Sequence, residues 1–117
     1  DVVLLRYAIR VNGITELALT KLDILSGFES LFICHAYEDG AESYQFLPMS
    51  PADLSRYKPI YKDLAGWEQD LTTVRNWEEL PDQARNYVLE IEKLAGVPVN
   101  IISVGPERSQ VIMRQNQ

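Results

Sequence analysis

The chain has 117 residues, which is enough for one compact domain of ordinary size and too few for two. Hydrophobic residues make up 46% and charged residues 24%, and these values exclude a disordered or fibrous chain. The net charge is −6 and the basic residues are scattered, so we expect neither a nucleic-acid partner nor an anionic membrane surface.

Cysteine content and apolar runs limit the cellular context. The single cysteine, Cys34, cannot by itself form a disulfide or a zinc site, which suits a reducing cytoplasm. No apolar run reaches the length of a membrane span, and no signal-peptide pattern is present. Because an apolar periodic pattern begins at once after Asp1, we expect the chain to start inside a longer protein.

The first half of the chain begins with a helix and a strand. Asp1 is a helix-capping residue and Asn12-Gly13 is a helix-ending signal, so the periodic apolar residues over 1–11 predict a helix. The nearly continuous apolar run at 17–20 predicts a strand that is covered on both faces.

A hairpin is expected next. Residues 31–38 are rich in β-forming types, Asp39-Gly40 is a turn signal, and 42–47 returns as a second strand. We expect a polar connection over 48–59, with a helical turn after Ser50-Pro51, and an extended segment at 60–64.

The second half contains the clearest helix. Asn76 and Glu79 have the spacing of a capping box, and Pro81 suits a first helical position. Apolar residues then recur at helical spacing until Gly96-Val97-Pro98 ends the helix. The apolar run 99–104 predicts a second buried strand.

Together these elements predict an α/β fold. Strands 17–20 and 99–104 are expected in one parallel sheet with flanking helices, while 110–114 adds an edge strand and the hairpin forms an antiparallel appendage. In such sheets ligands bind beyond the carboxyl ends of the strands. Two polar loops, Thr20–Asp23 and Ser103–Pro106, follow these ends and are the expected site.

The segment Thr20-Lys21-Leu22-Asp23 has the form of a guanine-specificity motif with Thr in place of Asn. A carboxylate at Asp23 accepts hydrogen bonds from both the ring N–H and the exocyclic amine of guanine, a donor pair that adenine lacks. The Lys21 stem covers the face of the base. The alternative interpretation is a strand-to-helix turn in which Asp23 caps the helix.

The segment Ser103-Val104-Gly105-Pro106 would form the second wall of the site. A small residue followed by glycine allows backbone N–H groups to approach the guanine carbonyl oxygen closely. Alone, this pattern is more typical of a strand end followed by a turn.

Other candidate residues favour structural roles. Strand alternation places His35, the single histidine, with Leu31, Ile33 and Tyr37, and gives it no acidic or nucleophilic partner. Cys34 is expected to be a small buried hydrophobe. Glu90, Glu92 and Lys93 are expected on a solvated helix face. There is no glycine-rich phosphate loop and no cluster of metal ligands.

With both loops in view, the sequence resembles the C-terminal part of the adenylosuccinate synthetases. The resemblance covers nearly the whole chain in family order, and His35 stands where the family usually has an apolar residue. The matching segments are Arg10–Gly13, Leu19–Leu25, Ala36–Glu38, Pro59–Tyr61, Gly66-Trp67, Leu80-Pro81, Asn86-Tyr87, Gly96–Pro98 and Ser103–Arg108.

The resemblance implies a GTP-dependent ligase that joins IMP to L-aspartate and forms adenylosuccinate. GTP phosphorylates the 6-oxygen of IMP, and the aspartate amine displaces that phosphate. Residues 1–117 would be the C-terminal fragment that carries the guanine-binding loops. The resemblance assigns guanine contacts to Lys21, Leu22, Asp23, Ser103, Val104 and Gly105.

The resemblance places the phosphate loop, the catalytic residues and the Mg²⁺ site in an N-terminal part that this chain lacks. We therefore expect no catalytic or metal-binding residue here, and no activity from the fragment alone. The intact enzyme is expected to be a cytoplasmic homodimer. The alternative is a stand-alone nucleotide-binding or interaction module without catalysis.

Overall fold

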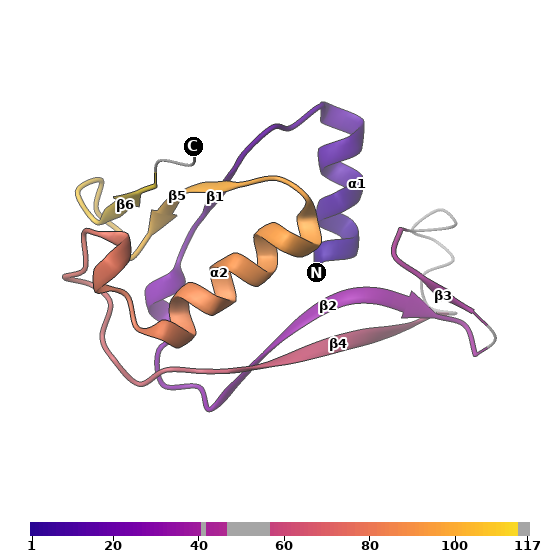
Figure 1. Ribbon diagram of the computed structural model, residues 1–117, viewed down its shortest axis with the longest axis horizontal. Helices are drawn as coiled ribbons and strands as arrows, with labels where there is room; N and C mark the ends of the chain where they lie inside the picture. The colour runs from indigo at the N-terminus through magenta and orange to yellow at the C-terminus, as the bar shows by residue number, and fades with distance from the viewer. Residues whose placement is uncertain (41, 47–56, 115–117) are drawn as a thin grey trace.

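The computed structural model describes residues 1–40, 42–46 and 57–114, which form a mixed α/β fold as predicted (Figure 1). The described elements, in chain order, are α1 (Val2–Asn12), β1 (Leu17–Leu19), the 3₁₀ helix η1 (Leu22–Leu25), β2 (Ser30–Glu38), β3 (Ser43–Tyr44), β4 (Lys58–Ala65), the 3₁₀ helix η3 (Trp77–Glu79), α2 (Asp82–Ala95), β5 (Val99–Ser103) and β6 (Val111–Met113).

The first sheet has the strand order β1-β5-β6. The pairing of β1 with β5 is parallel, which confirms the prediction that these two apolar strands share a parallel sheet. The predicted edge strand is also present, since β6 pairs with β5 in the antiparallel direction. Because β1 and β5 run in the same direction, the loops that follow them leave the sheet at the same edge.

The two faces of this sheet differ in burial. Ile102 and Ile112 are directly paired and fully buried, and half-buried Leu19 extends their row onto β1. On the other face, the paired residues Ala18, Ile101 and Met113 form a row that is apolar and exposed. The prediction that residues 17–20 form a strand covered on both faces is therefore wrong, because Ala18 is exposed.

The second sheet has the order β3-β2-β4. The predicted hairpin partner of β2 is short, because β3 contributes two pairs next to the Asp39-Gly40 turn. The long partner is β4, which pairs with β2 from Ser30 to Glu38. The extended segment expected at 60–64 is thus part of a strand, whereas Leu47 and the predicted turn after Ser50-Pro51 lie outside the described residues.

A β-bulge interrupts β2 at its histidine. Cys34 pairs with Tyr61 and Ala36 pairs with Ile60, which leaves His35 without a pair in the register. A bulge inserts one extra residue and breaks the alternation of faces. Leu31 and Ile33 accordingly belong to the main core, whereas Tyr37 belongs to a separate small cluster with Val3 and Cys34. The placement of His35 by simple alternation was therefore wrong.

Both α-helices end at glycines, and α1 begins at a side-chain cap. The Asp1 side chain accepts a hydrogen bond from the Leu4 N–H, and Gly13 and Gly96 adopt the left-handed conformation that ends α1 and α2. The predicted capping box differs, because Asn76 precedes a separate 3₁₀ turn and its side chain does not cap a backbone N–H. The Asn76 side-chain amide donates to the Glu79 carboxylate, while the Glu79 N–H donates to the Asn76 backbone carbonyl. No helix in the described ranges is long and apolar enough to cross a membrane.

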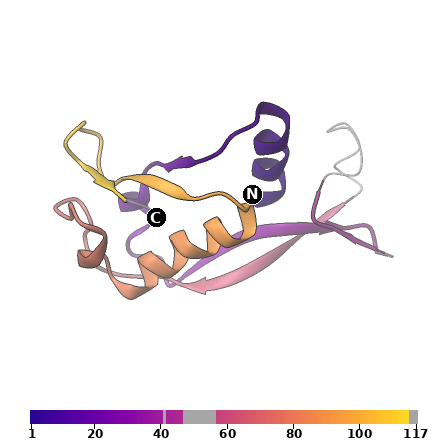
Figure 2. The same ribbon diagram turned by 45° about the horizontal axis from the view of Figure 1, so that its top comes forward.

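Helix α2 lies between the first sheet and the β2–β4 ribbon and contacts both (Figures 1 and 2). Its fully buried residues Ala84 and Val88 join the main core with Ile102 and Leu22. Its acidic residues are not simply solvated: Glu90 pairs with Lys62 at 2.6 Å, and Glu92 pairs with Arg114 at 2.8 Å. The solvated-face prediction therefore fails for both glutamates.

Candidate functional site

The two loops predicted to form the site lie together in the structure. A surface pocket of about 500 Å³ sits beyond the carboxyl ends of β1 and β5. Its lining combines residues from the end of β1 and from η1 with residues from the loop after β5: Thr20, Lys21, Asp23, Ile24, Ser103, Gly105 and Pro106. Four of the six predicted site residues are among them.

The turn from β1 into η1 is made by Lys21 in an unusual backbone conformation. Its φ of 61° and ψ of 35° place it in the left-handed region, and no other non-glycine residue in the described ranges has a positive φ. This conformation costs an ordinary L-residue roughly 1–2 kcal/mol. Such outliers concentrate at functional sites, where the surrounding fold holds them in place.

Asp23 lies within η1 and does not cap it. The residue at the N-terminal end of η1 is Lys21, and no side chain provides a cap there. Within the described part of the chain the half-buried Asp23 carboxylate has no hydrogen-bond or ion-pair partner, although its backbone oxygen accepts from Ser26. The alternative interpretation of Asp23 as a helix cap therefore does not describe this loop, and its carboxylate oxygens are available to accept from a ligand.

Two of the predicted contact residues have side chains that do not line the pocket. Leu22 and Val104 are fully buried, and both belong to the main core. The Val104 N–H is also engaged, since it donates to the Gln110 carbonyl at 2.9 Å. Their side chains anchor the two loops to the core instead of lining the pocket, because an apolar residue between polar loop residues gains most by burial.

The second wall of the pocket is formed by Ser103, Gly105 and Pro106. The Ser103 hydroxyl donates to the Gly105 carbonyl at 3.0 Å, which fixes the turn at the end of β5. The Gly105 N–H has no hydrogen-bond partner among the residues that the structure describes. A buried or half-buried N–H without a partner is a natural donor for a ligand oxygen.

Sequence reasoning missed part of the apolar lining. Ile24 is 62% exposed, and Pro106 is also exposed beside the pocket. Pro106 belongs to the predicted second loop, whereas Ile24, an apolar residue directly after the motif, gives no sequence signal that it faces a ligand. The pocket therefore combines a carboxylate, an ammonium group, a free N–H and apolar surface, which suits a flat heterocycle with polar edges.

Nearly the whole chain matches a family model. Residues 1–112 match the model described as adenylosuccinate synthetase, and this range includes both loops of the pocket. The chain belongs to the adenylosuccinate synthetase family. The adenylosuccinate synthetase of Oleidesulfovibrio alaskensis is 48% identical over 98% of the chain, and that of Mycobacterium tuberculosis is 49% identical over 99%.

A solved structure agrees with this assignment. The fully ligated adenylosuccinate synthetase from Plasmodium falciparum is 34% identical and superposes with a TM-score of 0.92 over 98% of the chain. The chain spans 27% of the length of the two bacterial synthetases and 28% of the solved one. The predicted placement at the C-terminal end of the longer protein is not supported by these matches.

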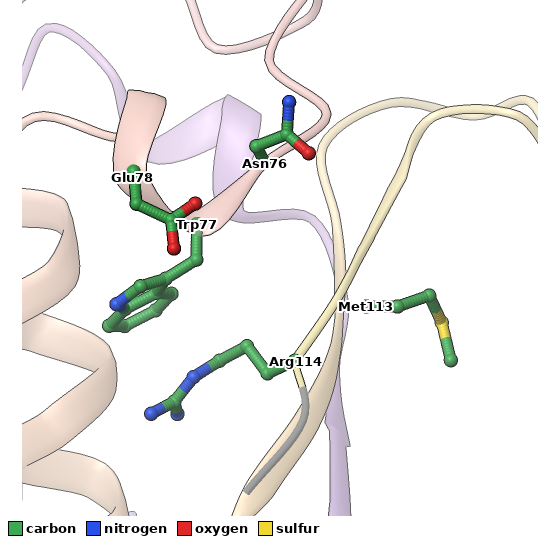
Figure 3. Close-up of a pocket in the computed structure, with 5 residues that line it drawn as sticks. All are labelled: Asn76, Trp77, Glu78, Met113 and Arg114. Atoms are coloured by element: carbon green, nitrogen blue, oxygen red, sulfur yellow. The ribbon is translucent and has the colours of Figure 1, made fainter.

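A second pocket in the described part of the chain is lined by a different set of residues. It has a volume of about 450 Å³ and is lined by Asn76, Trp77, Glu78, Met113 and Arg114 (Figure 3). Figure 3 shows Arg114 and Trp77 pointing toward each other, with Met113 pointing away. The Arg114 guanidinium lies 4.0 Å from the Trp77 ring centroid and pairs with Glu92, so its charge is compensated within the fold.

Catalytic groups are not apparent in the described part of this synthetase segment. His35 is half-buried at the β2 bulge and does not line the pocket. The described residues contain no group of three or more His, Cys, Asp or Glu side chains that could hold a metal ion. Cys34 is buried and its thiol lies 3.5 Å from the Ala36 carbonyl, as expected of a small core residue.

Proposed function

We propose that this chain is the guanine-recognition part of a GTP-dependent synthetase that joins IMP and L-aspartate to form adenylosuccinate. The observation that carries the proposal is the meeting of two loops, Thr20–Asp23 and Ser103–Pro106, around one pocket at the edge of a parallel sheet. Family membership supports the overall activity, and the chemistry of the lining supports the role of this part.

Guanine fits the polar groups of the pocket. Asp23 accepts from the ring N–H and the exocyclic amine, and a charged acceptor strengthens both hydrogen bonds. The methylene stem of Lys21 covers one face of the base. Adenine would instead present a ring nitrogen that is an acceptor to the carboxylate, which leaves two acceptors facing each other.

The carbonyl oxygen of guanine lies on the other side of the ring N–H from the exocyclic amine. The Gly105 N–H is the donor without a partner on that side, and Ser103 holds the Gly105 peptide through its carbonyl. Leu22 and Val104 act in this proposal through the core, where they fix the two loops that carry the contact groups. Four of the six predicted contacts are therefore backbone or positional.

The chemistry of phosphoryl transfer would come from outside these residues. The sequence has no glycine-rich phosphate loop, and the described residues do not fit a Mg²⁺ site. IMP, L-aspartate and the catalytic groups would therefore meet in the remaining part of the longer protein. Location in the cytoplasm and assembly as a homodimer remain predictions.

The second candidate, a stand-alone module, is opposed by the open face of the first sheet. A sheet that contains parallel strands is normally covered on both faces. Here Met113 is 64% exposed and Ile101 36% exposed in one apolar row with Ala18. This row favours a segment that is covered by the rest of a longer synthetase.

Initial-rate measurements test the proposal. The longer protein that contains this segment should form adenylosuccinate from IMP and L-aspartate with GTP, and ATP should support the reaction at least about 100-fold less well. The 117-residue segment alone should give no turnover and should bind GTP with a dissociation constant of about 1 mM or weaker, because the phosphate contacts are absent. Equal use of GTP and ATP, or turnover by the segment alone, would contradict the assignment.

A further inference from the structure

The loop between β5 and β6 closes on Gln110. Its backbone N–H donates to the Glu107 carbonyl at 3.0 Å, and its carbonyl accepts from the Val104 N–H at 2.9 Å. Gln110 is thus bonded to both the start and the middle of the loop that forms the second wall of the pocket.

The Gln110 side chain fills the inside of the same loop. Its Oε1 accepts from the Glu107 N–H at 3.0 Å, and its Nε2 donates to the Thr72 carbonyl at 3.3 Å. The Thr72 carbonyl also accepts from Arg75 at 2.7 Å, and the Thr72 N–H donates to Asp70. The carboxamide therefore ties the pocket loop to a second loop that has its own hydrogen bonds.

Gly105 is directly covered by this carboxamide. A Cβ on Gly105 would lie 2.2 Å from Cδ and 2.3 Å from both Nε2 and Oε1 of Gln110. Gly105 does not have a positive φ, so its backbone conformation alone would accept any residue. A side chain at position 105 would therefore displace the Gln110 carboxamide from the hydrogen bonds that it makes in this loop.

The Gly105 peptide is consequently held on two sides. Ser103 holds its carbonyl, Gln110 covers its Cα, and its N–H has no partner in the described part of the chain. Resting on the guanine-binding function proposed above, we propose that Gln110 is a positioning residue of the pocket. It fixes the Gly105 backbone so that the N–H meets the carbonyl oxygen of guanine, without touching the nucleotide itself.

Substitution of Gln110 in the longer synthetase tests this role. Gln110→Met keeps a similar volume but removes both side-chain hydrogen bonds. We expect kcat/KM for GTP to fall about tenfold, the effect of losing one well-placed hydrogen bond. With 6-thio-GTP, whose sulfur is a weak acceptor, the loss should be much smaller, so the preference for GTP over 6-thio-GTP should fall.

Three further measurements separate positioning from general damage. The preference for GTP over ITP should not change, because Asp23 reads the exocyclic amine, and KM values for IMP and L-aspartate should also not change. Ser109→Ala, at an exposed neighbour in the same loop, should leave the preferences for GTP over 6-thio-GTP and for GTP over ITP as in the wild type. An equal loss with GTP and 6-thio-GTP would overturn the positioning role. If the wild type itself uses GTP, 6-thio-GTP and ATP equally well, the proposed guanine-binding function is wrong, whatever the effect of the Gln110 substitution.

A second pair of variants tests the contact without nucleotide. Gly105→Ala should lower the unfolding temperature by a few degrees, because the new methyl group overlaps the Gln110 carboxamide. Adding Gln110→Ala should recover part of this loss, since it removes the three atoms nearest to the methyl group. If Gly105→Ala lowers the unfolding temperature equally in both backgrounds, Gln110 does not hold Gly105 and the proposal is wrong.

Discussion

At the scale of single residues, the proposed recognition of guanine depends on the carboxylate of Asp23. Asp23→Asn should weaken the use of GTP and improve the use of XTP in the longer synthetase. Xanthine has an oxygen in place of the exocyclic amine, and an Asn amide donates to that oxygen while its own oxygen accepts from the ring N–H. We expect kcat/KM for GTP to fall by about 30- to 1,000-fold.

The control for Asp23→Asn is the binding of the other substrates. KM values for IMP and L-aspartate should move little, since Asp23 is assigned no contact with either. Comparing kcat/KM for GTP and XTP in the wild type and the variant gives the answer. An unchanged GTP-to-XTP ratio would show that the Thr20–Asp23 loop does not read the base.

The left-handed backbone at Lys21 predicts an effect on stability. Lys21→Gly and Lys21→Ala both remove the side chain, but glycine adopts this conformation without strain. The glycine variant should therefore be more stable than the alanine variant by about 1 kcal/mol, as measured by urea unfolding. Both should lose affinity for GTP equally. A more stable alanine variant would mean that position 21 does not keep this conformation in solution.

The sequence predicted the polar residues that line the pocket better than the residues that pack behind it. Lys21 and Asp23 follow from a short motif whose residue types match guanine chemistry. Gln110 was not predicted, because its role arises from contacts with Gly105 and Thr72, which are set by tertiary packing. Leu22 and Val104 were assigned as contacts because a motif does not show which of its side chains turn toward the core.

At the scale of elements, local signals identified turns and helix ends but not all pairings. Asp39-Gly40 correctly indicated a turn, yet β2 pairs mainly with β4, which follows a long intervening segment. The bulge at His35 has no local signal, since it depends on how β4 aligns with β2. The parallel pairing of β1 and β5 was predicted because both segments are short, nearly continuous apolar runs. This pattern is visible in the sequence whatever turns lie between the two strands.

The attachment of β6 to α2 gives a prediction at this scale. Arg114 pairs with Glu92, donates to the Val99 carbonyl at 3.1 Å and stacks on Trp77. The paired side chains are 12% and 16% exposed, so Arg114→Met should lower the free energy of unfolding by about 2–3 kcal/mol. The measurement is chemical denaturation of the longer synthetase.

A second ion pair on α2 provides the matched control for Arg114→Met. Arg85 pairs with Asp82, whose side chain is 87% exposed, and water screens this pair. Arg85→Met should cost no more than about 0.5 kcal/mol. Equal costs for the two variants would show that Arg114 acts as an ordinary surface residue.

At the scale of the whole molecule, the exposed row of Ala18, Ile101 and Met113 is the surface that the rest of the longer synthetase would cover under the proposed function. Met113→Lys should change the stability of the 117-residue segment by no more than about 0.5 kcal/mol, because Met113 is 64% exposed there. In the longer synthetase the same change should cost about 2 kcal/mol or more, because it would bury a charge.

The control for Met113→Lys is a lysine at an exposed polar position. Asn86→Lys, on α2, should have a small effect in both proteins. Thermal unfolding of the four variants compares the costs directly. If Met113→Lys is equally mild in the segment and in the longer synthetase, the open face of the sheet is not covered by the rest of the protein.

The parallel pairing of β1 with β5 also has a consequence for folding. Leu17 pairs with Val99, so the two walls of the pocket come from opposite ends of the segment. Closing so long a loop of chain costs conformational entropy before any contact compensates for it, and such long-range parallel pairing is slow. The pocket therefore arises late, as β5 docks beside β1, and during synthesis on the ribosome no nascent chain that lacks β5 can form it.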